Sequence, residues 1–281
     1  MSVSPCILAA NQGGGVSAFT ITRADGTLVA VSGSPFTTGT TPVWVAVDPG
    51  GRFVYVVNGG SSDISGFAIN SSTGALTGFS STFPVTATPL RATVDPLGRF
   101  LYVALGTGGT EVFKINSDGT LAVVRTVPAA PCAASHAVAL DASSKYVFVA
   151  DGSTGICNYA VNASSGDLTL ITSTIIPAGT NPVAVAAGAN GKFLFAANKG
   201  SSNLSGYVIN ADGTLTAMSG SPFSVGSAPV DVTVDPSGAF VYVANFSGNS
   251  VSVFSINSSK SLSSVGTTTA GTNPNSVVTT Q

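Results

Sequence analysis

Charged residues are scarce in this chain: of its 281 residues only 8% are Asp, Glu, Lys or Arg, and the formal net charge is −2. Globular domains usually carry about 25% charged residues, so helices with one charged and one apolar face are not expected. No run of Lys or Arg occurs, and such a run is the electrostatic footprint of a nucleic-acid-binding protein. The composition therefore argues against a helical fold and predicts no nucleic acid as a partner.

Long apolar runs are missing as well. No stretch of about eighteen apolar residues exists, so the sequence predicts no membrane-spanning helix. Residues 1–10 lack the charged start and the long apolar core of a signal peptide. The chain is nevertheless poor in Lys and Glu and rich in Ser and Thr, as many exported proteins are. We therefore expect a monomeric bacterial protein that is extracellular, periplasmic or on the cell surface, with a leader that is not present in this chain.

Residues that carry chemistry are few, since the chain has one His and one Glu. It contains no Ser-His-Asp signature, no phosphate-binding loop and no dinucleotide fingerprint. A central calcium ion would need several converging carboxylates or amides, and only Asp231, Asp151 and Asn275 offer them. The sequence accordingly predicts no metal site and no cofactor.

The chain does have a clear internal repeat. Residues 229–245 (PVDVTVDPSGAFVYVAN) hold two runs of alternating β-branched and aromatic residues around a turn sequence, which predicts two antiparallel strands. A sixth copy is split between residues 274–281 and residues 6–11. The other four copies, at spacings of 45 to 47 residues, lie at 42–58, 89–105, 135–151 and 182–198. A fixed period of this size is typical of a solenoid, an array or a propeller.

Each repeat has room for four short strands joined by hairpin-sized loops. Four-stranded units of this length are propeller blades, whose apolar faces are buried against neighbouring blades. The sequence thus predicts an all-β fold and a single domain over residues 1–281. We expect a six-bladed β-propeller of four-stranded antiparallel blades, closed by pairing of the C-terminal segment 274–281 with the N-terminal blade. The expected blades are 274–281 with 1–41, 42–88, 89–134, 135–181, 182–228 and 229–273.

The recurring phrase also carries a family resemblance. The FVYVVN of residues 53–58 and the FVYVAN of residues 240–245, each following a DPxG turn, resemble the YVTN-repeat proteins of the lactonase-like β-propeller superfamily. The resemblance covers essentially the whole chain and implies the fold, because the motif residues are strand and turn residues whether or not a member is an enzyme. Catalytic members are implied to be 6-phosphogluconolactonase-like hydrolases and a cycloisomerase that closes carboxymuconate lactones. These are usually seven-bladed, so six blades would be a departure.

Departures from the repeat identify candidate site residues. In a propeller the start of each innermost strand and the adjoining loops form one rim, so unusual residues at these positions converge. Some residues replace a small apolar or amide residue of the repeat, and others directly follow such a position. The predicted ligand-binding residues chosen in this way are Trp44, Arg91, His136, Asp151, Lys199 and Asp231. Trp44 would stack on a small polar or carbohydrate-like ligand, and Arg91 would bind a carboxylate or phosphate. Alternatively, Arg91 and Asp231 simply extend into solvent and Trp44 fills the top of the channel.

Three functions remain open at this point. The first is a non-catalytic binding or scaffold propeller with a small polar ligand at the channel mouth. The second is a lactonase-like hydrolase acting on a sugar or organic-acid lactone, in which His136 would be the general base and Arg91 would hold the developing oxyanion. The third, suggested by the blade number, is a trimmed or engineered propeller without a retained activity.

The three cysteines form an odd set. Cys132 lies in the loop that leads into the fourth blade, and Cys157 begins the third strand of that blade. Both are expected near the same rim, so we predict a disulfide between Cys132 and Cys157, typical of an oxidising compartment. Cys6 is expected on a strand as a buried thiol.

Overall fold

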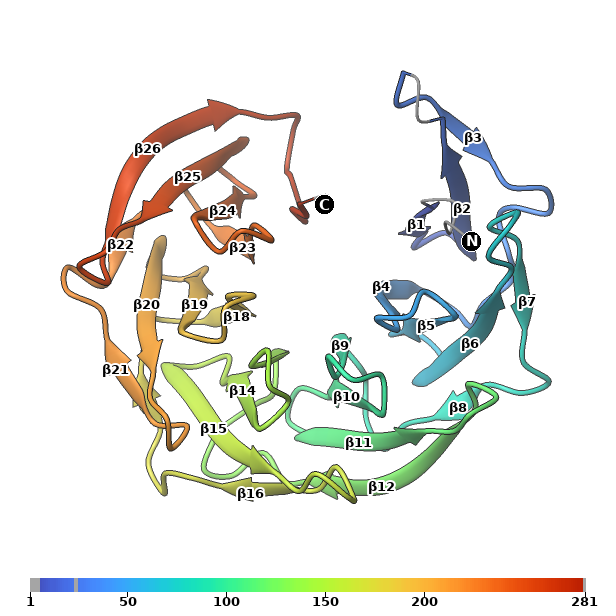
Figure 1. The fold of residues 1–281 in the computed structure, drawn as a ribbon, viewed down its shortest axis with the longest axis horizontal. Helices are drawn as coiled ribbons and strands as arrows, with labels where there is room; N and C mark the ends of the chain where they lie inside the picture. Colours follow the sequence, from blue (N-terminus) through green and yellow to red (C-terminus); the bar gives the residue numbers. More distant parts are fainter. Residues whose placement is uncertain (1–5, 23–24, 280–281) are drawn as a thin grey trace. The chain divides into compact units, whose positions relative to one another are not determined.

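The computed structural model describes residues 6–22 and 25–279. These residues form β-strands, turns and loops and no helix, so none of them forms a helix that could span a membrane. Two compact units can be distinguished, Met1–Pro128 and Ala129–Gln281. Each unit contains three antiparallel sheets (Figure 1).

The first unit contains the sheets of the first three repeats. Its strands are β1 (Cys6–Ala10), β2 (Val16–Ile21) and β3 (Leu28–Ala30) in the first sheet; β4 (Pro42–Val47), β5 (Phe53–Asn58), β6 (Asp63–Ile69), β7 (Leu76–Gly78) and β8 (Phe83–Pro84) in the second; and β9 (Arg91–Val94), β10 (Phe100–Ala104), β11 (Thr110–Ile115) and β12 (Leu121–Val127) in the third. In the second sheet β7 and β8 both pair with β6, so the outermost strand is broken into two pieces.

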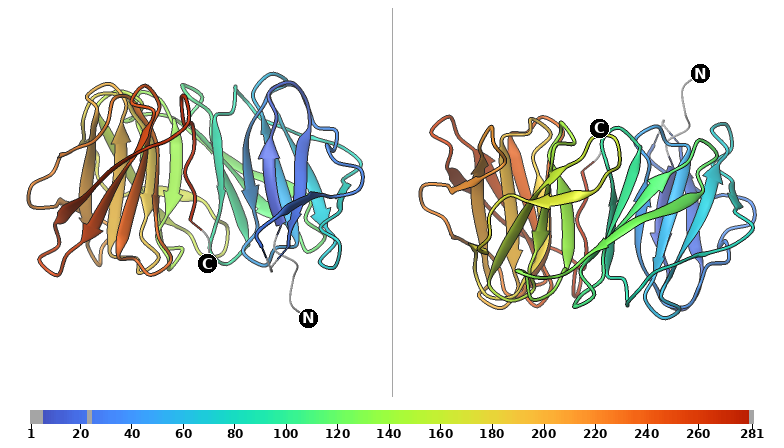
Figure 2. Two further views of the ribbon diagram at one scale, coloured as in Figure 1. Left: turned by 90° about the horizontal axis from the view of Figure 1, so that it is seen from above. Right: turned by 90° about the horizontal axis from the view of Figure 1, so that it is seen from below.

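The second unit repeats this plan. Its strands are β13 (Ala137–Leu140), β14 (Tyr146–Ala150), β15 (Gly155–Val161), β16 (Leu168–Leu170) and β17 (Ile176–Pro177); β18 (Pro182–Ala187), β19 (Phe193–Asn198), β20 (Asn203–Ile209), β21 (Leu215–Ala217) and β22 (Phe223–Ser224); and β23 (Pro229–Val234), β24 (Phe240–Asn245), β25 (Ser250–Ile256) and β26 (Leu262–Thr269). Strands of one sheet follow one another in chain order, joined by short turns (Figure 2).

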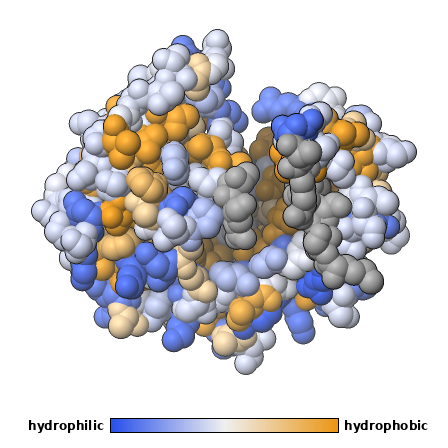
Figure 3. Space-filling model, turned by 45° about the horizontal axis from the view of Figure 1, so that its top comes forward, coloured by the Kyte–Doolittle hydropathy of each residue, from blue (hydrophilic) through white to orange (hydrophobic). Residues whose placement is uncertain are grey.

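The second strand of each repeat forms the core. All six residues of β5 and of β19 are buried, which explains why the recurring phrase is apolar at successive positions instead of alternating. In the first unit Tyr55, Leu101 and Phe113 pack in one cluster that joins the second and third sheets. Burial of each such side chain contributes about 2 kcal/mol. Exposed apolar side chains are instead spread among polar residues (Figure 3).

The turn between the first two strands is held by an aspartate, as the repeat predicts. Asp48 Oδ1 accepts hydrogen bonds from the backbone N–H groups of Arg52 and Phe53, the latter at 2.7 Å. Asp95 does the same for Arg99 and Phe100. These carboxylates fix the hairpins and are not candidates for a binding site.

The chain therefore has the six blades of a β-propeller, three in each unit, and the predicted fold class is confirmed. The N-terminal sheet, β1 to β3, has three strands, because residues 270–279 contain no strand and residues 280–281 lie outside the described part of the chain. Pairing of 274–281 with the first blade, and the single-domain organisation, stay predictions.

Candidate functional site

Trp44 and Arg91 form one stacked pair in the first unit. Trp44 is the third residue of β4 and Arg91 is the first residue of β9, the strands that begin the second and third blades. Arg91 Cζ lies 4.4 Å from the centroid of the Trp44 ring. Trp44 Nε1 donates a hydrogen bond of 2.8 Å to the carbonyl oxygen of Ala92, so the indole is anchored to the neighbouring blade.

This geometry has a chemical consequence. A guanidinium that stacks on an aromatic ring uses its face for the cation–π contact, while its N–H donors are directed along its own plane. Carboxylates and phosphates bind a guanidinium in that plane, through two parallel hydrogen bonds. The stacked pair thus fixes the orientation of the Arg91 guanidinium at the start of β9.

Strand register shows which candidate residues share one position. In the second to sixth sheets, one residue of the first strand lies opposite the fifth residue of the neighbouring strand; these residues are Trp44, Arg91, Ala137, Ala184 and Asp231. A register shift precedes Trp44 and Asp231, at Pro42 and Pro229. His136 comes one residue before Ala137, and successive strand side chains point to opposite faces. His136 therefore does not occupy the register position of Trp44, Arg91 and Asp231, although the expected rim placed them together.

His136 lies against the backbone that follows β14. Its N–H donates a hydrogen bond of 2.9 Å to Ala150 O, and its side chain is half-buried. The imidazole passes directly over Gly152, since a Cβ at that residue would lie 2.6 Å from both Cδ2 and Nε2 of His136. Gly152 also has a φ of 73°, a left-handed conformation that favours glycine. The position of the ring thus depends on a residue without a side chain.

Asp151 is a buried anchor for the loop before β13. Its carboxylate accepts hydrogen bonds from Ser153 Oγ, from the N–H of Thr154 at 3.0 Å, and from the N–H of Ala133. Burial raises the pKa of Asp151, but these hydrogen bonds outweigh burial and hold the pKa below its ordinary value. The carboxylate is fully buried, and its hydrogen bonds join the loop before β13 to the loop after β14.

This anchoring implies a pH-dependent stability. Because the folded-state pKa of Asp151 is depressed, its stabilisation is present above the unfolded value of about 3.9 and is lost as the pH falls through the folded value. We expect Asp151→Asn to cost about 2 kcal/mol of unfolding free energy at pH 7. Urea unfolding of both proteins should show this difference shrinking below about pH 4. A difference that stays constant down to pH 2 would contradict the role of the ionised carboxylate.

The cysteines of the fourth blade hold the same loop. Cys132 and Cys157 are joined in a disulfide with a Cα–Cα distance of 6.1 Å. In the second blade the corresponding loop is held by a hydroxyl instead, because Asn58 Nδ2 donates to Ser65 Oγ at 2.9 Å and Ser65 Oγ also accepts the N–H of Gly39. Equivalent Asn-to-Ser bonds join Asn198 to Ser205 and Asn245 to Ser252. Asp151 and Cys157 thus replace an Asn–Ser pair.

Glu111 is a further replacement that the sequence comparison did not single out. It is buried, with 2% of its surface exposed, and its Oε2 accepts hydrogen bonds from the N–H of Thr86 at 3.0 Å and from Thr86 Oγ1 at 3.3 Å. Opposite Val103 in the third blade, Glu111 occupies the register position that Ser65 has in the second. Serine recurs at this position of the repeat, as Ser65, Ser205 and Ser252. An alignment of the third strands could therefore have identified Glu111 as a departure.

The two remaining candidates have different surroundings. Asp231 is 4% exposed, and its Oδ2 accepts hydrogen bonds from Ser276 Oγ at 2.7 Å and from the N–H of Val277 at 3.0 Å. It thereby fastens the C-terminal segment beside β23. Lys199 is exposed directly after β19.

Residues 6–22 and 25–279 contain no group of three or more His, Cys, Asp or Glu side chains that could hold a metal ion.

Comparison with known proteins relates the chain to one family. The family model described as lactonase, 7-bladed beta-propeller, matches residues 6–182 and 149–280. The overlap of the two matched segments reflects the internal repeat. No curated protein matches the sequence.

Several solved structures share the fold of this chain. A proposed 6-phosphogluconolactonase from Bacteroides uniformis has a TM-score of 0.82 at 21% identity, with 97% of this chain and 85% of that chain covered. Another from Bacteroides fragilis has the same TM-score and identity, with coverage of 99% and 85%. The periplasmic gluconolactonase PpgL from Pseudomonas aeruginosa has a TM-score of 0.58 at 18% identity, with coverage of 95% and 96%. At these identities the similarity shows the fold alone.

Proposed function

Because this chain belongs to the seven-bladed β-propeller lactonase family, we propose that it is a lactonase-like propeller that binds a small anionic ligand through Trp44 and Arg91. The observation that carries this proposal is the guanidinium stacked 4.4 Å from the centroid of an indole that is itself anchored to Ala92. Such a pair combines a planar cation, the group that recognises carboxylates and phosphates, with the apolar edge of an indole ring. Sugar acids and sugar phosphates combine both features.

Variants of the pair test this proposal. With 6-phosphogluconate as the probe, Arg91→Gln should weaken binding by about 30-fold, because loss of a charged hydrogen-bonding partner costs about 2 kcal/mol. Arg91→Lys should recover only part of the affinity, since an ammonium group cannot bind an anion through two parallel bonds. Titration calorimetry measures both effects. Equal affinity of wild type and Arg91→Gln would contradict the assignment.

Lactone hydrolysis is the second candidate function, and the family relationship favours it. In this function His136 would act as a general base and Arg91 would stabilise the developing oxyanion, as expected from the sequence. Arg91 belongs to the first unit and His136 to the second. The role of each residue is therefore tested with its own variant. A pH-stat assay over sugar and organic-acid lactones should show turnover that falls about 100-fold or more in His136→Ala with an unchanged melting temperature. Absence of turnover in the wild-type protein would leave the binding function alone.

Export to an oxidising compartment fits the disulfide of the fourth blade. Disulfides form and persist outside the cytosol and are rare within it, and the bond between the buried residues Cys132 and Cys157 fixes the loop before β13. We propose an extracellular, periplasmic or cell-surface location and a monomer. Alkylation and mass spectrometry of protein from its native source should find this pair oxidised. Two free thiols at these positions would contradict export.

A further inference from the structure

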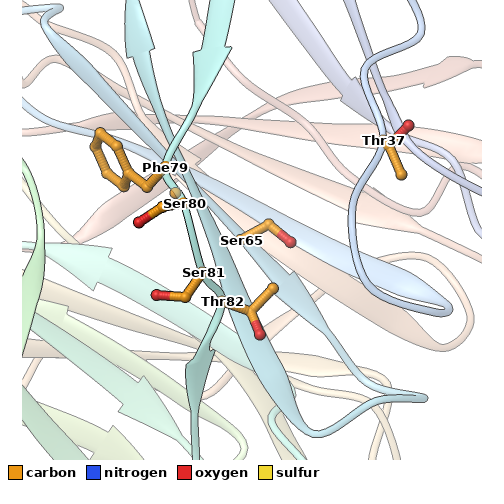
Figure 4. A pocket seen from close by; sticks show the side chains of 7 residues that line it. Thr37, Ser65, Phe79, Ser80, Ser81 and Thr82 are labelled. Atoms are coloured by element: carbon orange, nitrogen blue, oxygen red, sulfur yellow. The ribbon is translucent and has the colours of Figure 1, made fainter.

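A pocket of about 200 Å³ opens in the second blade, away from Trp44 and Arg91, in the gap between the two pieces of the outer strand, β7 and β8 (Figure 4). Its lining consists of Thr37, Ser65, Gly66, Phe79, Ser80, Ser81 and Thr82. The lining contains five hydroxyl groups and one aromatic ring, and no charged side chain. All of these residues belong to the first unit.

Comparison with the first and fifth blades explains why the gap exists. In those blades a serine hydroxyl fills it: Ser34 Oγ accepts the N–H of Ala18, and Ser221 Oγ accepts the N–H of Gly206, both at 3.0 Å. Each serine belongs to a Ser-Gly-Ser-Pro segment, at residues 32–35 and 219–222. The second blade has the shorter Ser-Ser-Thr at 80–82 instead, so it lacks this serine.

The backbone of Gly66 is exposed to the pocket as a result. Its carbonyl oxygen accepts the N–H of Phe79 at 3.0 Å, as those of Ala18 and Gly206 accept the N–H groups of Val31 and Met218. Its own N–H points toward the same side of the strand. Within the described part of the chain, the structure gives this N–H no acceptor, whereas the equivalent groups bond to serine. The pocket therefore contains a buried backbone donor, which costs free energy unless an acceptor reaches it.

Ser65 supplies a second donor. It is 5% exposed, and its Oγ accepts hydrogen bonds from Gly39 N–H at 3.1 Å and from Asn58 Nδ2 at 2.9 Å. With both acceptor positions used, the hydroxyl hydrogen remains to be donated. Figure 4 shows the Ser65 hydroxyl directed toward Thr37 and away from Phe79. An acceptor in the pocket would satisfy this group as well.

The aromatic wall is held in a defined position. Phe79 packs against Phe53 and Phe83 with ring centroids 6.2 Å apart in each case. The ring also lies over Gly66, where a Cβ would come within 2.4 Å of it. Because three neighbours fix the ring, a ligand meets a preformed apolar surface beside the hydroxyl groups.

We propose that this pocket binds one ring of a neutral sugar. The buried donors require oxygen acceptors, the exposed hydroxyls of Ser80, Ser81 and Thr82 can donate or accept, and the ring of Phe79 suits the C–H face of a pyranose. The absence of charge in the lining disfavours an anion, which separates this site from Trp44 and Arg91. The volume is below the roughly 300 Å³ of pockets for larger ligands, so it fits a single ring.

Amide NMR spectra of the full chain test the proposal, with methyl glucoside, methyl galactoside and methyl mannoside as probes. At least one probe should shift the amide signals of Gly66 and of residues 80–82, with saturation at a dissociation constant on the order of 1 mM for so small a ligand. The amides of Ala18 and Gly206, which are already bonded to serine, should stay unchanged and serve as internal controls. If no probe moves the Gly66 amide, the proposal is wrong.

A loop exchange provides the matched variant. Replacing Ser80–Thr82 with the Ser-Gly-Ser-Pro of residues 219–222 introduces a segment that the same chain already uses, and its serine should fill the gap. We expect at least tenfold weaker sugar binding and an unchanged melting temperature. Ser80→Ala should weaken binding, whereas Ser32→Ala, its counterpart in the first blade, should not. Unchanged sugar affinity in the exchanged protein would overturn the assignment, while anion binding to Arg91 is expected to survive in every variant.

Discussion

Replacing both Cys132 and Cys157 by serine is expected to lower the free energy of unfolding by about 3 kcal/mol. The disulfide closes a loop with a sequence separation of 25 residues, and the loss of loop-closure entropy in the unfolded chain has this magnitude. The loop before β13 would keep its hydrogen bonds to Asp151 but lose its covalent link to β15. Calorimetry should show a fall in melting temperature of about 6 °C for a protein of this size.

Reduction supplies the control for this prediction. Dithiothreitol should lower the melting temperature of the wild-type protein toward that of the Cys132→Ser, Cys157→Ser variant and leave the variant itself unchanged. A variant as stable as the wild type would show that Asp151 alone holds the loop.

Asp95→Ala is expected to cost about 3 kcal/mol. The carboxylate is fully buried and accepts the N–H groups of Arg99 and Phe100, the latter at 2.9 Å, while the Arg99 guanidinium lies 2.9 Å from Oδ2. Removing it leaves two backbone donors that face the buried position of Asp95 without an acceptor, at about 1–3 kcal/mol each. Urea unfolding measures the loss directly.

Asp235→Ala is the matched comparison. Asp235 occupies the same turn position and accepts the N–H groups of Ala239 at 2.8 Å and Phe240 at 2.7 Å, but it is half-buried and has Ala239 where Asp95 has Arg99. Water can reach the donors that it leaves, so we expect a loss of about 1 kcal/mol. Equal losses for the two variants would contradict the role of burial.

The blade architecture could be predicted from the sequence because the same strand and turn pattern occurs six times. The phrase that ends in FVYVVN or FVYVAN predicted the strands β5 and β24, and the Asp in the preceding turn predicted the hydrogen bonds of Asp48. Local chemistry determines both features: β-branched and aromatic residues favour strands, and an aspartate accepts backbone N–H groups in a turn.

The candidate site was less predictable because it depends on register. The repeat alignment already places His136 one residue after Ser135 and Trp44 two residues after Pro42, and the strand register shows that this single step separates their positions. Burial of Asp151 and Asp231 was equally hidden, because their partners are loop and terminal backbone groups distant in sequence. Glu111 and the pocket beside Gly66 each result from a single departure from the repeat. The role of each departure can be recognised only from the hydrogen bonds of the folded chain.

Tryptophan fluorescence provides the most direct test of the proposed function, since Trp44 is the only tryptophan in the chain and stacks on Arg91. Titration with 6-phosphogluconate should change the emission with saturation, because an anion that binds Arg91 alters the contact with the indole. The same titration of Arg91→Gln should saturate only at concentrations about 30-fold higher. An emission that stays constant in the wild-type protein, or that changes equally in Arg91→Gln, would contradict anion binding at this pair.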